Sequence, residues 1–101
     1  MTKKDKFARI QQENLNLYVA KNKDYGDSFG ETFEEFGVTM LAIRLHDKFK
    51  RFKKLIMTNE QEIKTESVID TLKDLSNYAI MAIIELENEP DPEDKKSEKR
   101  W

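Results

Sequence analysis

The sequence predicts an all-α fold, and both its composition and its hydrophobic periodicity support this prediction. Charged residues make up 38% of the 101 residues and hydrophobic residues another 38%, while only three Gly and two Pro are present. Such a composition favours long amphipathic helices over a turn-rich β fold. The length predicts a single helical domain, 1–88, with three main helices over about 5–20, 33–57 and 66–87.

The first predicted helix, 5–20, begins with Asp5 as its N-cap. Its apolar residues fall around one broad face, which we expect to pack on the core: Phe7, Ile10, Leu15, Tyr18 and Val19. The segment "ETFEEFG", residues 31–37, is predicted to form a short turn of helix at the start of the second helix, 33–57, which has the clearest periodicity in the chain. Its core arc is predicted to contain Leu41, Leu45, Phe49, Phe52 and Ile56.

The third predicted helix, 66–87, is capped by Thr65 or Ser67 and ends before Pro90 and Pro92. Its predicted core stripe is Val68, Leu72, Leu75, Ala79, Ala82 and Leu86. Ile80, Met81 and Ile84 make its second half apolar nearly all round, which a small protomer cannot cover alone. We therefore expect a homo-oligomer, a dimer or tetramer, that associates through this helix. The tail 89–101 has mixed charge and no periodicity and is predicted to be disordered, with Trp101 as the one residue that could dock.

Several function classes are disfavoured by charge and composition. The net charge is −2, so no overall basic field attracts DNA or RNA, and no nucleic-acid partner is expected. With no Cys and only His46, a metal site would be built from oxygen ligands, which suit Mg²⁺, Mn²⁺ or Ca²⁺. The basic N-terminus is not followed by a signal-type apolar run, and no apolar run reaches the roughly 18 residues that span a bilayer. The expected location is the cytoplasm, with no membrane partner.

Two charged stripes are candidate functional features. Arg44, Asp47, Lys48 and Arg51 share one flank of the second helix, beside its apolar arc. A solvated flank explains them without function, but the closeness of Lys48 to the arc favours an anionic ligand. Glu66, Asp70 and Asp74 follow one another in steps of four on the third helix, where the carboxylates repel and a divalent cation would relieve them.

The segment "KNKDYGDSFG", residues 21–30, is predicted to be a loop that carries more chemistry than a turn needs. As a functional loop, it would offer cationic, acidic, hydroxyl and aromatic side chains to a ligand, and Gly26 would permit a positive φ. As an ordinary loop, it would be closed by Asp24 and Gly26, with Tyr25 packed on the core.

The segments "KNKDYGDSF", "RLHDKFKR" and "ESVIDTLKDLSNYAI" occur in this order over about residues 10 to 87. Together they resemble the nucleotide modification associated domain family of small proteins from bacteriophages and prophages, which is similar to the all-α NTP pyrophosphohydrolases. The resemblance implies an oligomer with four-helix-bundle sites, in which acidic side chains hold Mg²⁺, or Mn²⁺, against a nucleotide's phosphates.

By position, the resemblance implies particular roles. Asp47, Glu66, Asp70 and Asp74 would be metal ligands, the first three with catalytic roles. The substrate-binding residues would be Lys21, Lys23, Asp24, Tyr25, Ser28, Arg44, Lys48 and Arg51. Lys21 and Lys23 would reach phosphates, Tyr25 would stack on a base, and Asp24, Asp27 or Ser28 would hydrogen-bond the sugar or base. The implied reaction converts a (d)NTP to its monophosphate and pyrophosphate in phage nucleotide metabolism.

The acid pattern departs from that superfamily. The third-helix acids are four residues apart instead of three, and the second helix lacks an acid pair. The alternative is a non-catalytic protein that sequesters a nucleotide or a nucleotide signal. A helical interaction protein with solvated charged stripes is the third hypothesis.

Overall fold

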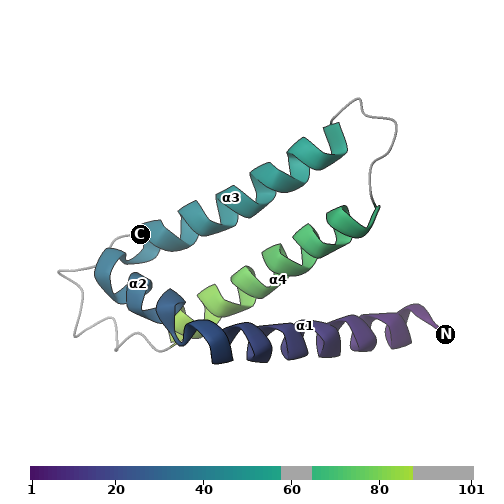
Figure 1. Ribbon diagram of the computed structural model, residues 1–101, viewed down its shortest axis with the longest axis horizontal. Helices are drawn as coiled ribbons and strands as arrows, with labels where there is room; N and C mark the ends of the chain where they lie inside the picture. Colours follow the sequence, from purple (N-terminus) through teal and green to yellow (C-terminus); the bar gives the residue numbers. More distant parts are fainter. Residues whose placement is uncertain (58–64, 88–101) are drawn as a thin grey trace.

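The computed structural model describes residues 1–57 and 65–87, which form four α-helices and contain no strand. Their bounds are α1 Lys3–Tyr25, α2 Ser28–Phe36, α3 Val38–Met57 and α4 Thr65–Glu87. Figure 1 shows α3 and α4 running antiparallel, with α1 beneath α4 and the short α2 joining α1 to α3. The all-α prediction is confirmed, and the prediction of three main helices is corrected to four. The predicted disordered tail and Trp101 lie outside the described residues.

Helix α1 begins two residues earlier and ends five residues later than predicted. Its N-cap is Thr2, whose Oγ1 accepts from Asp5 N at 3.0 Å, while Asp5 Oδ2 accepts from Thr2 N at 2.9 Å. Asp5 is therefore the reciprocal partner in a capping box and not the N-cap. The hydrogen bond from the Thr2 backbone holds the pKa of Asp5 below its ordinary value. At the other end, the predicted loop residues Lys21–Tyr25 continue α1 to Gly26.

Helix α2 lies between two glycines in a backbone conformation that other residues avoid. Gly26 has φ 64° and ψ −155°, and Gly37 has φ 72° and ψ −157°, a region that is essentially restricted to glycine. The N-cap is Asp27, whose Oδ1 accepts from Gly30 N at 3.2 Å. The prediction of one helix over 33–57 is wrong, because Gly37 ends α2 and α3 begins at Val38.

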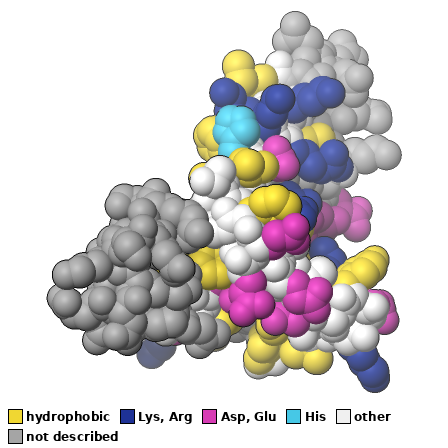
Figure 2. Space-filling view, turned by 90° about the vertical axis from the view of Figure 1, so that its left-hand side faces the viewer, with side chains coloured by type: hydrophobic (Ala, Val, Ile, Leu, Met, Phe, Trp, Pro, Cys, Tyr) yellow, Lys and Arg dark blue, Asp and Glu magenta, His cyan; other side chains and the backbone are white. Residues whose placement is uncertain are grey.

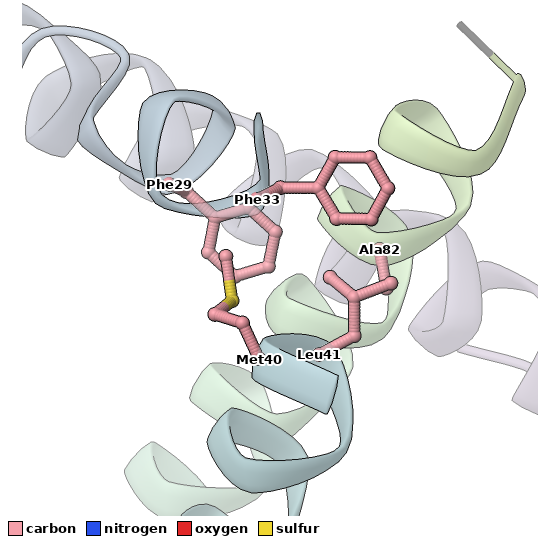
Figure 3. Packing of buried hydrophobic residues seen from close by; sticks show 5 residues of the cluster. All are labelled: Phe29, Phe33, Met40, Leu41 and Ala82. Atoms are coloured by element: carbon pink, nitrogen blue, oxygen red, sulfur yellow. The ribbon is translucent and has the colours of Figure 1, made fainter. Parts of the chain in front are cut away.

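The apolar core lies where α2, the start of α3 and the second half of α4 meet (Figure 3). Its buried members among the described residues are Phe29, Phe33, Met40, Leu41 and Ala82. Leu41 and Ala82 confirm two predicted core positions. Phe49 and Ile56 on α3, and Leu72 and Leu86 on α4, were predicted as core but are exposed. For Phe49, Ile56 and Leu72, the cause is that α3 and α4 meet α2 at one end only, so the core is concentrated at that end.

Helix α1 is attached to α4 by polar contacts. Asn14 is its one buried residue, with Nδ2 donating to Ser76 Oγ at 3.3 Å and its carbonyl oxygen accepting from Asn77 Nδ2 at 3.1 Å. Lys73 Nζ pairs with Glu13 Oε1 at 2.9 Å. Hydrogen bonds from Lys73 and then Arg9 lower the pKa of Glu13.

The apolar face predicted for the first helix is not buried within one chain. Phe7, Ile10, Leu15 and Val19 are all exposed. Since the buried position between them is Asn14, the helix is placed by hydrogen bonds and not by the apolar residues that predicted its orientation. None of the helices in the described ranges is long and apolar enough to span a bilayer.

Candidate functional site

A cleft with a cavity volume of about 270 Å³ opens where the end of α1 faces α4 and the starts of α2 and α3. The end of α1 contributes Tyr18, Lys21, Asn22 and Tyr25, and the turn and α2 contribute Gly26, Ser28 and Phe29. Helix α3 contributes Arg44, and α4 contributes Asp74, Asn77, Tyr78 and Met81. The site is therefore assembled from all four helices.

The extra turn of α1 explains how polar residues from the predicted loop enter this cleft. Residues three, four and seven positions apart lie on one face of a helix, and Tyr18, Lys21, Asn22 and Tyr25 have this spacing. The turn at Gly26 and Asp27 then brings Ser28 and Phe29 back against the same space. A segment that seemed to be a loop thus forms one helical wall of the cleft.

Asp74 joins three helices at the cleft. Its Oδ1 accepts from Lys21 Nζ of α1 at 3.2 Å, and its Oδ2 accepts from Lys48 Nζ of α3 at 3.4 Å. One carboxylate therefore faces two ammonium groups, and Arg44 adds a third cation to the cleft. These ion pairs are long and partly exposed, so they contribute little to stability. Their consequence is electrostatic, because the cleft retains an excess of positive charge.

Tyr78 forms the aromatic floor beside this charge. Its ring stacks on Phe29 with the centroids 5.7 Å apart and the planes 17° from parallel. Lys48 Nζ lies 5.4 Å from the centroid of the same ring, within the range of a cation–π contact. Lys48 is thus held by both Asp74 and Tyr78. Tyr25, by contrast, is 73% exposed at the mouth of the cleft.

Charge is also separated between the helices around the cleft. Helix α3 carries Lys or Arg at six positions against the single Asp47, whereas α2 carries three Glu and no cation. Figure 2 shows most of the Lys and Arg side chains of one face in its upper part and most of the Asp and Glu side chains below them. An anion approaching the cleft from the α3 side would meet attractive charge.

The structure brings together about half of the predicted site residues. Lys21, Tyr25, Ser28, Arg44 and Asp74 line the cleft, and Lys48 touches it through Asp74 and Tyr78. Lys23, Asp24 and Arg51 are exposed and do not line it. The same holds for Asp47, Glu66 and Asp70. Within residues 1–57 and 65–87 of one chain, no group of three acidic or histidine side chains could hold a metal ion.

Sequence reasoning missed the amides and part of the aromatic floor. Asn22 and Asn77 line the cleft, as do Phe29 and Tyr78. A signal for the α4 residues was present, because Asn77, Tyr78 and Met81 follow Asp74 by three, four and seven positions and so share its face. In the same way, Asn22 follows Tyr18 by four positions and so lies on the same face of α1.

The fold and the cleft define a small all-α protein with a site of cations, amides and aromatic rings, a composition that suits a phosphorylated organic ligand. Residues 21–86 match the family described as Nucleotide modification associated domain 1. The match covers more than half of the chain, so the chain belongs to this family and contains a domain associated with nucleotide modification. Every cleft residue except Tyr18 lies within the matched range. No curated protein and no solved structure matches the chain significantly.

Proposed function

We propose that the protein binds a nucleotide in the cleft between α1, α3 and α4. The observation that carries this proposal is the convergence of Lys21 and Tyr25 of α1 with Arg44 of α3 on one cavity, inside a domain associated with nucleotide modification. Lys and Arg are the side chains that bind phosphate oxygens, and an exposed tyrosine ring offers a stacking surface to a base.

The existing contacts of the cleft residues indicate which part of the nucleotide each residue would bind. The Tyr78 ring already contacts Phe29 and Lys48, which makes exposed Tyr25 the stacking residue. Lys21 and Arg44 take the phosphates, and Lys48 supports them with charge from behind Asp74. Asn77 donates through Nδ2 to Asn14, so its Oδ1 is the acceptor available to a base or sugar. Lys23, Asp24 and Arg51 remain predicted contacts at the rim.

Magnesium-dependent hydrolysis of a (d)NTP to its monophosphate is a second candidate, favoured by the presence of Asp74 among the cations. The described residues of one chain do not provide the ligand set for Mg²⁺ or Mn²⁺, because Asp47, Glu66 and Asp70 lie outside the cleft. A metal site that includes Asp74 therefore requires further carboxylates from a second copy of the chain. Within one chain, the geometry supports binding better than hydrolysis.

The test is a panel of NTPs, dNTPs and monophosphates, each with and without Mg²⁺, followed by thermal stabilisation and by pyrophosphate release. A ligand at about 100 times its Kd stabilises the protein by about 2.7 kcal/mol. We expect one or more nucleotides to raise the Tm of the wild type, and we expect Arg44→Ala and Tyr25→Ala to lose most of this shift. Lys50→Ala, an exposed cation on the same helix outside the cleft, is the matched control and should keep it.

Asp74→Asn separates the two candidate functions. In a binding protein, loss of this carboxylate frees Lys21 and Lys48 for phosphate, so affinity is retained or increased. In a hydrolase, the same substitution abolishes pyrophosphate release. If no nucleotide stabilises the wild type or is turned over by it, both candidates are wrong and the charged stripes are solvated surface.

A further inference from the structure

The cleft between α1, α3 and α4 contains few charged groups for a site that suits phosphate. Among the described residues that line it, only Lys21, Arg44 and Asp74 are charged. Lys48 adds a third cation, because its Nζ lies 3.4 Å from Asp74 Oδ2. With three cations and one carboxylate, these four side chains have a combined charge of +2 at neutral pH.

The carboxylate of Asp74 already contacts two of the three cations. Its Oδ1 accepts from Lys21 Nζ at 3.2 Å, and its Oδ2 accepts from Lys48 Nζ at 3.4 Å. The side chains of Asp74 and Lys48 are each 27% exposed, so water and salt screen their charges less than those of fully exposed side chains. A phosphate group that binds Lys21 and Arg44 is therefore also repelled by a carboxylate in the same cleft.

The combined charge of the cleft matches one phosphate group. A phosphate monoester carries a charge of about −1.5 to −2 at pH 7, which balances the positive charge of the four side chains. A triphosphate carries more negative charge on its two further phosphate groups. The free energy needed to take an ion out of water rises with the square of its charge, whereas its attraction to fixed cations rises only in proportion to the charge. Further phosphate groups therefore add more to the desolvation cost than to the attraction.

The surroundings of the cleft offer no cations to a longer phosphate chain. The other described residues that line it are uncharged, among them Asn22, Ser28 and Asn77, while Lys23 and Arg51 are exposed and do not line it. Helix α2, which borders the cleft, carries three Glu and no cation. The cavity volume of about 270 Å³ is also slightly below the range of about 300–1,000 Å³ that is typical of small-molecule sites. The cleft therefore favours a small ligand with one phosphate group.

We propose that Asp74 restricts the cleft to nucleotides with a single phosphate group, the nucleoside monophosphates. This inference rests on the nucleotide-binding function proposed above and names the phosphate count of the ligand. Lys21 of α1 and Arg44 of α3 bind the phosphate, and Asp74 disfavours diphosphates and triphosphates by keeping the combined charge at +2. If Asp74 only links the three helices, it stabilises the fold and has no effect on the choice between phosphate chain lengths.

The test is isothermal titration calorimetry of the full chain with the mono-, di- and triphosphates of each common ribonucleoside and deoxyribonucleoside. EDTA is present, so that Mg²⁺ does not neutralise the longer phosphate chains. For the nucleoside that binds best, we expect the wild type to bind the monophosphate at least about tenfold more tightly than the triphosphate, because like charges within a binding site are costly. Asp74→Asn should lower this ratio to about threefold or less, because the more highly charged ligand gains more from the added positive potential.

The matched control is Glu87→Gln, which removes the same charge from an exposed position of α4 outside the cleft and should keep the wild-type ratio. Two results would overturn the inference while nucleotide binding stands: a wild type that binds triphosphates as tightly as monophosphates or more tightly, or an unchanged ratio in Asp74→Asn. If none of these nucleotides binds the wild type, the proposed function fails and the inference fails with it. Far-UV circular dichroism checks that each variant is folded, and the comparison of phosphate chain lengths in the wild type needs no variant.

Discussion

The two faces of α4 are packed in different ways. On one face, α2 and α3 bury apolar side chains against Ala82, with Phe33 and Leu41 among them. On the other face, α1 is attached through Asn14 and an ion pair, and the neighbouring apolar side chains stay exposed. Apolar burial contributes about 25 cal/mol per Å², whereas a hydrogen bond contributes about 1 kcal/mol net. The comparison indicates that the α2–α3 face supplies most of the stability of one chain, while α1 is held mainly by polar contacts.

Leu41→Ala should disrupt the packing on the α2–α3 face of α4 and cause the largest loss of stability. Leu41 is 4% exposed in the core, and truncation of a buried leucine costs about 2–5 kcal/mol because lost transfer energy adds to a cavity. Urea unfolding followed by circular dichroism measures the loss. The control is Ile43→Ala on the same helix, which is exposed and should cost no more than about 1 kcal/mol in a single chain. Equal losses in the two variants would contradict the assignment of the core to this face.

Asn14→Ala tests the other face and should have an intermediate effect. It removes the donor to Ser76 and also the unsatisfied Oδ1, so we expect a loss of about 1 kcal/mol. Hydrogen exchange should show faster exchange of the α1 amides, with little change in α3. Asn16→Ala is the control, because the Asn16 side chain is exposed and accepts a hydrogen bond from Gln12 of the same helix. If α3 and α4 open together with α1, the two faces form a single cooperative unit and the contrast is wrong.

Glu85→Gln should have the smallest effect on stability, and it tests the electrostatics where α2 packs on α4. Burial raises the pKa of Glu85, and the negative charges of Asp27 and Glu34 raise it further. Ionised Glu85 therefore destabilises the folded chain above its folded pKa, and this penalty disappears as the pH falls below its ordinary value of 4.5. Glu85→Gln should stabilise the protein at pH 7 by up to about 0.5 kcal/mol, with no gain near pH 4.

The matched control for this measurement is Glu87→Gln, at an exposed position of the same helix. It should leave the pH dependence of urea unfolding unchanged. A gain for Glu85→Gln that stays constant between pH 4 and pH 7 would show that the carboxylate repulsion is not its cause.

The fold class could be predicted from the sequence, but the packing partners of each helix could not. Periodicity identified Leu41 and Ala82 as core residues, and both are buried in the same cluster. It failed at Phe7 and Leu15 because an amphipathic pattern shows that a face needs cover without showing whether the cover comes from the same chain. It also ran through Gly37, since apolar residues continue on both sides of the break. There, the backbone conformation of one residue decides the boundary.

The candidate site was predicted in part for a similar reason. Lys21, Tyr25 and Arg44 were named from their chemistry together with the family resemblance, and the structure places them around one cleft with Asp74. The polar composition of Lys21–Tyr25 suggested a loop, although only Gly26 carried a signal for the end of the helix. That error concealed Asn22, which faces the cleft only because α1 continues. Which acids converge depends on how α3 and α4 are rotated, and one helical wheel does not determine this.

The two glycines that bound α2 impose a constraint of handedness. Gly26 would meet no atom within 4 Å if a side-chain carbon were added, yet its φ of 64° with ψ −155° excludes L-residues. The mirror image of this conformation is close to the extended polyproline region that L-residues adopt freely. D-alanine therefore satisfies the backbone at Gly26, and by the same reasoning at Gly37, where L-alanine does not. What these two positions require is an inverted chiral centre or none, and glycine is the one genetically encoded residue that meets this requirement.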